Sequence, residues 1–169
     1  LLPLTDHFTG APGRLHRFVV SAQSPWDLFC AKGARMNEQA LARPDQPQVV
    51  ASAPWIRRVP LRSPTLPPAT HTNAYVLGES ELLVVDPGSP WPDAQAPLWD
   101  SLQALRAQGH TLRAVLLTHH HYDHVSGAAE LARALGVPLW AHPDTRRRLS
   151  NQPELTIDER VRYGDLLPF

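Results

Sequence analysis

The most constraining feature of the sequence is a short histidine-rich stretch that separates two apolar runs. Four histidines and an aspartate occupy five of the six positions from 119 to 124. The apolar run 113–118 precedes them, and the alanine- and leucine-rich run 127–135 follows, a pattern that predicts a strand, a loop and a helix. Imidazole nitrogens and carboxylate oxygens are ligands for zinc, iron and manganese. The stretch therefore predicts a metal site at the end of a strand.

The spacing within this stretch predicts which side chains act together. His119 and His121 are two positions apart, so in an extended loop they point the same way. Asp123 and His124 are adjacent and diverge, which suits ligands of a second ion. Two ions about 3.5–4 Å apart are the arrangement with which hydrolytic sites activate water. The alternative is a solvated histidine tract that binds metal by accident, but it leaves the fixed offsets unexplained.

These residues resemble the metallo-β-lactamase fold hydrolases, and the resemblance covers roughly residues 55–169. The family motif His-x-His-x-Asp-His lies on His119, His121, Asp123 and His124. The resemblance implies that the first pair binds one metal ion and the second pair binds the other.

Two upstream segments extend the resemblance. Asp86 follows the apolar run 81–85 and precedes Pro87-Gly88, where the family has an aspartate that buttresses the metal loop. The run 72–77 is similar to the opening strand of the glyoxalase-II-like branch and its endoribonuclease-type relatives. The family's fold is an α/β sandwich with αββα layers, a mixed sheet with flanking helices in each half. This chain is expected to form one half of it.

The resemblance also implies a chemistry. A metal-bound hydroxide would attack an ester, thioester, lactone or phosphodiester, and Asp123 would hold an ion and orient the nucleophile. Two Zn²⁺ per intact site are expected, with iron or manganese as possible replacements. The substrate would be a small ester or thioester, or RNA. Two alternatives stay open: a catalytically incomplete fragment or subunit with a partial metal site, and an iron-dependent sulfur dioxygenase.

The remaining family ligands have no counterpart in the sequence. The family completes its two sites with a third histidine, a bridging aspartate and a further histidine, and all three would fall beyond Phe169. The expectation is therefore an N-terminal part, truncated before the third metal histidine. A lone half would expose the inner face of its sheet, so a C-terminal half or a homodimer partner is expected to cover it.

Residues 1–54 do not resemble the family and are predicted to be an unassigned appendage, or the tail of a preceding domain with a proline-rich linker. Short strands are predicted around 14–20 and 26–31, and a weak helix over 32–43. Prolines between residues 44 and 70 predict a linker that holds one edge strand, at 55–59.

The remaining elements follow from apolar periodicity. The runs 74–78 and 81–86 predict a hairpin that ends at Asp86. A helix is predicted next, with Asp93 as N-cap and Leu98, Leu102 and Leu105 as its buried stripe. Ser126 is predicted to cap the helix that ends at Gly136. A strand over 137–141 and a short helix from 143 follow.

Bulk properties exclude little. The 16 basic and 16 acidic side chains balance, so charge does not favour a polyanionic partner. The single cysteine, Cys30, excludes an internal disulfide framework and leaves the cytoplasm as the default compartment. No apolar run is long enough to span a bilayer, so no membrane partner is expected. His71, before the first predicted hairpin strand, is expected to be structural or to face the substrate.

Overall fold

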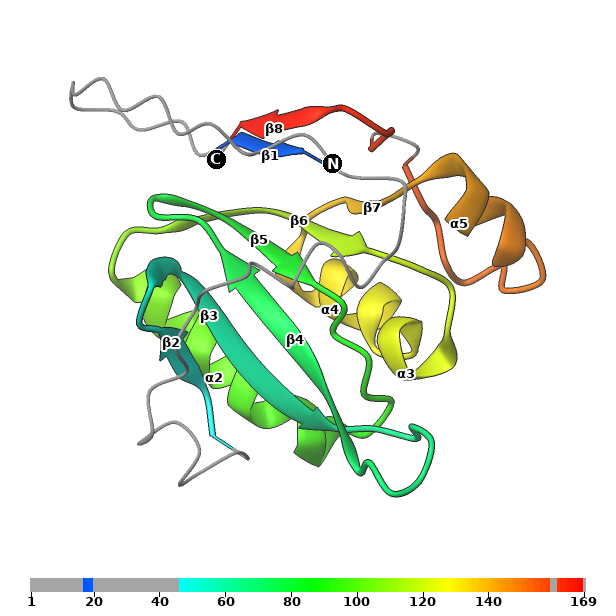
Figure 1. Ribbon diagram of the computed structural model, residues 1–169, viewed down its shortest axis with the longest axis horizontal. Coiled ribbons are helices and arrows are strands. Elements are labelled where there is room, and N and C mark those ends of the chain that lie inside the picture. Colours follow the sequence, from blue (N-terminus) through cyan, green and yellow to red (C-terminus); the bar gives the residue numbers. More distant parts are fainter. Residues whose placement is uncertain (1–16, 20–45, 159–160, 169) are drawn as a thin grey trace.

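A computed structural model describes residues 17–19, 46–158 and 161–168 of the chain. Six strands form one sheet in the order β2-β3-β4-β5-β6-β7, and β1 and β8 form a separate two-stranded pair (Figure 1). The strands are β1 (Arg17–Val19), β2 (Gln48–Val50), β3 (Ala53–Arg62), β4 (His71–Leu77), β5 (Glu81–Val85), β6 (Thr111–Leu117), β7 (Leu139–Ala141) and β8 (Leu166–Pro168). The helices are α2 (Pro92–Ala107), α3 (Tyr122–Val125), α4 (Ala128–Leu135) and α5 (Pro143–Arg148).

The sheet changes from antiparallel to parallel in its middle. Strands β2 to β5 pair antiparallel, whereas β5, β6 and β7 pair parallel. The connection from β5 to β6 contains α2, and the connection from β6 to β7 contains α3 and α4. Parallel strands place their carboxyl ends at one rim. The ends of β5 and β6, which lead into Asp86 and Thr118, therefore meet there, and the α/β class with a mixed sheet is as predicted.

The helix-covered face of the sheet holds the larger core. By the helix-covered face we mean the side of the sheet whose apolar side chains pack against α2 and α4. These two helices lie behind the sheet in Figure 1. The predicted stripe of α2 is buried as expected. Burial of a leucine or valine side chain contributes about 1.5–3 kcal/mol, so this face supplies most of the hydrophobic stabilisation. Its sheet residues include Val59, Leu61, Ala74, Val76, Leu82, Val84, Leu112, Val115 and Leu117.

The second face of the sheet has a smaller apolar cluster. Its strand residues alternate with those of the helix-covered face and are Leu77, Leu83, Val85, Ala114 and Leu116. Val161 and Leu167 pack onto them from the last described segment, whose strand β8 pairs antiparallel with β1. All five strand residues are buried. The predicted exposure of this face is therefore wrong for these positions, because residues far along the chain pack on them.

Several local predictions differ from the structure. Strand β3 is not an edge strand, because β2 pairs with it on the side away from β4. Pro60 is tolerated in β3 because β2 does not extend to it. Helix α2 begins at Pro92 with Trp91 as N-cap. Asp93 lies in its first turn and pairs with Arg62 at 2.6 Å.

The N-terminal predictions fall mostly outside the described residues. Of the strand predicted around 14–20, Arg17–Val19 forms β1. The strand predicted at 26–31 and the helix predicted over 32–43 lie outside the described ranges. Strand β2 joins the main sheet from within the segment predicted as an appendage, and the division at residue 54 stays a prediction. No helix in the described part of the chain has both the length and the apolarity needed to cross a bilayer.

Candidate metal centre

The histidine-rich stretch lies at the rim where β5 and β6 end. His119, His120 and His121 follow β6 in irregular backbone, and His121 is the N-cap of α3. Asp123 and His124 lie on α3, a single helical turn where the sequence predicted only a loop. The turn forms because the amides of His124 and Val125 both bond to the carbonyl of His121.

Asp86 forms the base of this loop. Its Oδ1 accepts a hydrogen bond from the Thr118 amide at 2.8 Å, and its Oδ2 accepts one from the Thr118 hydroxyl at 2.5 Å. The same Oδ2 lies 3.1 Å from Nδ1 of His124. Asp86 is 4% exposed, and its φ of 48° lies in the left-handed region that non-glycine residues rarely adopt. Strained backbone of this kind persists where the surrounding contacts hold it in place.

Two glycines allow the Asp86 loop and the metal loop to touch through their backbones. A Cβ on Gly88 would lie 1.9 Å from the carbonyl oxygen of Asp123. A Cβ on Gly127 would lie 2.4 Å from the carbonyl oxygen of Ser89. Any larger residue would push the loops apart, because backbone atoms cannot move aside as a flexible side chain can.

Hydrogen bonds from three side chains fix the same interface. Ser126 Oγ donates to the Gly88 carbonyl at 2.8 Å, so this residue ties the loops together and is not the predicted cap of α4, whose N-cap is Gly127. Thr72 Oγ1 donates to the Asp123 carbonyl at 2.9 Å. Gln95 Nε2 donates to the Ser89 carbonyl at 2.9 Å. The backbone that carries Asp86 and Asp123 is therefore held from β4 and α2 as well.

The predicted ligands converge on one place. The rings of His119 and His121 meet edge to face with centroids 4.7 Å apart, and those of His119 and His124 lie 4.2 Å apart. His124 Nε2 lies 3.8 Å from Asp123 Oδ2. Two ligand atoms about 2.1 Å from one ion are at most about 4.2 Å apart, so this spacing fits a shared ion. Ligand atoms of Asp86, His119 and His124 also lie within 4.8 Å of one another.

Two histidines have opposite shifts in pKa. Burial lowers the pKa of His119, and the neighbouring charge of His124 lowers it further. Burial also acts to lower the pKa of His124, but the hydrogen bond to Asp86 and the charges of Asp86 and Asp123 outweigh it and raise the pKa. The lowered pKa of His119 favours its neutral form, which is the form that binds metal. The contact with Asp86 places the proton of His124 on Nδ1 and leaves Nε2 as the ligand atom.

A cavity of about 390 Å³ opens over these side chains. It brings together all five predicted site residues, namely Asp86, His119, His121, Asp123 and His124. His71 also lines it, from the start of β4. Sequence reasoning placed no role on the other wall residues, Thr65, Thr72, Asn73, Tyr75 and Thr118. Thr72, Asn73 and Tyr75 belong to β4, and their place at the cavity follows only from the pairing of β4 with β3 and β5.

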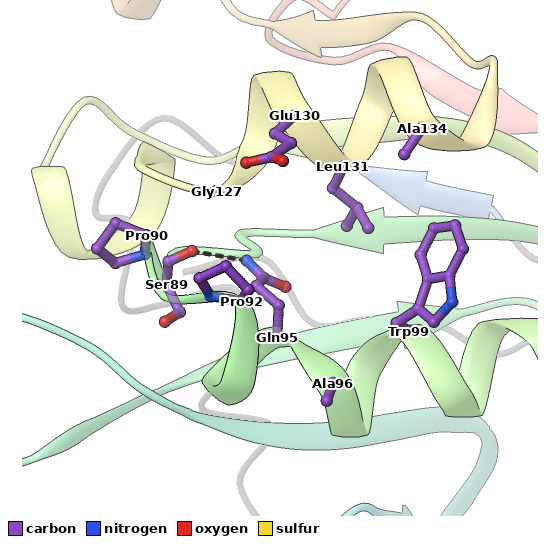
Figure 2. Close-up of a pocket in the computed structure, with 10 residues that line it drawn as sticks. All are labelled: Ser89, Pro90, Pro92, Gln95, Ala96, Trp99, Gly127, Glu130, Leu131 and Ala134. Carbon is purple, nitrogen blue, oxygen red and sulfur yellow. Dashed lines mark hydrogen bonds between the residues drawn. The ribbon is translucent and has the colours of Figure 1, made fainter.

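A second cavity lies between α2 and α4 and has a different lining. Figure 2 shows Gln95 and Trp99 of α2 on one side of it and Leu131 and Ala134 of α4 on the other, and Ala96 also lines it. Its volume is about 300 Å³ and its lining contains no histidine. The dashed line in Figure 2 is the bond from Gln95 to Ser89. This cavity therefore lies beside Gln95, which holds the Asp86 loop, and its lining offers no set of metal ligands.

Curated proteins with similar sequences are hydrolases by name. An atrochrysone carboxyl ACP thioesterase of Passalora fulva is 33% identical over 129 residues, which are 74% of this chain and 35% of that protein. A hydroxyacylglutathione hydrolase of Jannaschia sp. (strain CCS1) is 42% identical over 76 residues, 44% of this chain and 28% of that protein. The chain thus spans about a third or less of the length of these relatives.

Solved structures share the fold. A metallo-beta-lactamase from Pontibacter korlensis aligns with a TM-score of 0.53 and 14% identity, over 73% of this chain and 59% of that one. The DIM-1 metallo-beta-lactamase aligns with a TM-score of 0.51 and 18% identity, over 66% and 50%. The family model for the metallo-beta-lactamase superfamily matches residues 67–167. This chain therefore belongs to the metallo-beta-lactamase superfamily.

Proposed function

We propose that this chain carries the metal-binding part of a metal-dependent hydrolase that cleaves thioesters. The observation that carries the proposal is the convergence of His119, His121, Asp123 and His124 on one cavity above Asp86. Two relatives support the substrate class, because their names are those of an acyl-carrier-protein thioesterase and a hydroxyacylglutathione hydrolase.

The donor set fits a divalent ion such as Zn²⁺. Imidazole nitrogen and carboxylate oxygen are the ligands that zinc takes in hydrolytic sites. His119 Nδ1 lies 2.9 Å from the Thr118 hydroxyl, which leaves its Nε2 to face an ion. Asp86 has both oxygens engaged by Thr118 and His124. It is therefore assigned to support, and the four motif residues are assigned as ligands.

Four ligands shared by two ions leave coordination positions to be filled. Zinc in catalytic sites takes about three protein ligands and a water. We propose that a further segment of the protein or a second copy of the chain supplies the remaining ligands and covers more of the cavity. A site with a single ion, or with iron or manganese in place of zinc, would use the same donors.

In this proposal each side chain has a definite role. A bound divalent ion would supply Lewis-acid activation of water and of the thioester carbonyl. Asp123, whose carboxylate lines the cavity beside His124, is placed to accept a hydrogen bond from the attacking water and to orient it. Asp86 keeps the ring of His124 in one orientation, and Thr118 keeps Asp86 in place.

The test is hydrolysis of a set of thioesters, oxygen esters and RNA by protein saturated with Zn²⁺, Mn²⁺ or Fe²⁺. We expect thioester cleavage that chelation abolishes and added metal restores. His119→Ala and Asp123→Ala should remove it, whereas His142→Ala, outside the cavity lining, should not. Cleavage that survives chelation or the Asp123 substitution contradicts the proposal.

A further inference from the structure

One arginine beside the metal cavity has a charge that no carboxylate in the described chain balances. Arg58 lies on β3, directly opposite Tyr75 of β4, and its side chain is half-buried. Its Nη2 donates to Gln48 Oε1 at 2.7 Å, and its Nη1 donates to Asn73 Oδ1 at 3.3 Å. Both acceptors are neutral amides. They hold the guanidinium in place without cancelling its charge.

Two other arginines of the same sheet are neutralised by carboxylates, whereas Arg57 donates to the hydroxyl of Ser101 on the helix-covered face. Arg62, four residues further along β3, pairs with Asp93 at 2.6 Å, and Arg113 of β6 pairs with Glu81. A half-buried charge without a counter-ion is unfavourable unless something else stabilises it. A guanidinium has five N–H donors, and the hydrogen bonds of Arg58 to Gln48 and Asn73 use two of them.

The charge of Arg58 acts on the wall of the metal cavity. Asn73 and Tyr75 both line that cavity together with His119 and Asp123. Burial raises the pKa of Tyr75, the charge of Arg58 and the hydrogen bond of Asn73 lower it, and the charge of Asp86 raises it. Arg58 stands directly opposite Tyr75 in the register of β3 with β4, so its charge lies next to this wall of the cavity. The row from Arg58 through Asn73 to Tyr75 connects β3 to the cavity.

We propose that Arg58, Asn73 and Tyr75 form a subsite that recognises an anionic group of the substrate, a carboxylate or a phosphate, beside the metal centre. The planar fork of a guanidinium matches the oxygens of either group. An ion held by the motif residues would engage the scissile bond, and this subsite would engage the charged end of the same molecule. The inference rests on the proposed function, because it assigns part of the substrate for that site.

The test compares charged and neutral forms of one substrate on the zinc-loaded 169-residue chain. Three thioesters share an acyl chain that ends in a carboxylate, a phosphate or the methyl ester of the carboxylate. The readout is the ratio of kcat/KM for each charged form to that for the methyl ester. In Arg58→Gln this ratio should fall about tenfold to a hundredfold, as expected when a charge-assisted hydrogen bond is lost. The charged form whose ratio falls more identifies the group that the subsite prefers.

Arg57→Gln is the matched control. Arg57 is the neighbouring residue of the same strand, but it points to the opposite face and donates to Ser101 of α2. It should leave the ratio unchanged. Arg58→Lys, which keeps the charge without the fork, should lower the ratio less than Arg58→Gln does. An unchanged ratio in Arg58→Gln, or an equal fall in Arg57→Gln, overturns the subsite.

A binding measurement separates this inference from the proposed function. The free dicarboxylate and the carboxy-phosphate that correspond to the two charged acyl chains are titrated into each variant and followed by NMR. If the wild type cleaves no thioester, the proposed function fails, and the titration alone decides the subsite. Weaker binding in Arg58→Gln than in Arg57→Gln supports it, and equal binding in the two variants contradicts it.

Discussion

The two faces of the sheet differ in what covers them and in what they carry. The helix-covered face is closed by α2 and α4 with side chains such as Leu98 and Leu102 that are fully buried. The second face is covered over its apolar part by Val161 and Leu167, and toward the rim it turns polar, at Arg58, Asn73 and Tyr75. One face thus stabilises the fold and the other presents the site. Mutations should separate these two roles.

The largest expected effect comes from the glycine that joins the two loops. Gly88→Ala would place a Cβ against the backbone of Asp123, and neither loop can yield without moving Asp86 or α3. We expect a loss of about 4 kcal/mol or more in the free energy of unfolding, together with loss of metal binding. The measurements are chemical denaturation and zinc titration.

Gly109→Ala is the control for this substitution. Gly109 has a positive φ, of 93°, which Gly88 does not have, and nothing lies within 4 Å of the position of its Cβ. We expect a cost of about 1 kcal/mol from backbone strain alone and normal zinc binding. A Gly88→Ala protein as stable as Gly109→Ala would mean that the two loops are not locked together.

Core truncations compare the two faces directly. Leu102→Ala should cost about 2–5 kcal/mol, because Leu102 is 0% exposed and lies between α2 and the sheet. Leu83→Ala, on the second face, should cost less, because β8 and its neighbours are a smaller cover that can collapse onto the gap. Urea denaturation of both variants measures the difference. Equal losses would show that the second face is as tightly packed as the first.

Asp86→Asn tests support of the metal site without a change in side-chain size. It removes the charge that faces His124 while an amide oxygen can still accept from Thr118. Loss of such a partner typically lowers metal affinity tenfold to a hundredfold. Competition with a chelating dye measures this. An unchanged affinity would mean that Asp86 holds the loop only through Thr118.

The smallest expected effect concerns the pH dependence of zinc affinity. The raised pKa of His124 means that its proton competes with metal above the ordinary value of about 6.5, so zinc affinity should keep rising with pH through that region. In the metal-free protein the sign is opposite. The pair of His124 with Asp86 stabilises the fold below about pH 6.5, and this contribution is lost as the pH rises through the raised pKa.

Asp86→Asn gives a control for the pH dependence as well. Without the carboxylate, burial lowers the pKa of His124 unopposed by that partner. The upper inflection of zinc affinity should then move to lower pH. An inflection that stays where it is in the wild type would assign the pH dependence to another group.

Sequence patterns predicted the elements that their own residues determine. The hairpin that ends at Asp86, the strand before the histidines and the leucine stripe of α2 follow from periodicity alone. The motif His-x-His-x-Asp-His predicted the side chains that line the cavity. Its grouping into two pairs of ligands, one pair for each ion, stays a prediction.

What the sequence did not predict depends on pairing between distant segments. Strand β2 pairs with β3 in a segment whose prolines predicted a linker. Leu167 packs on strands that lie about fifty to ninety residues earlier in the chain, a long-range contact that no local pattern encodes. The row of Arg58, Asn73 and Tyr75 exists only in the register of β3 with β4. A one-residue slip between the two strands would place Arg58 on the face opposite to Asn73 and Tyr75.

The most direct test of the central claim is metal content by elemental analysis after equilibrium dialysis against Zn²⁺. For the wild type and for His142→Ala we predict at least one zinc per chain, rising toward two where the remaining ligands are supplied. For the double variant His119→Ala, His121→Ala we predict a clear loss of bound zinc at equal helix content. Equal zinc in the double variant and in His142→Ala would contradict the assignment of the metal centre to this loop.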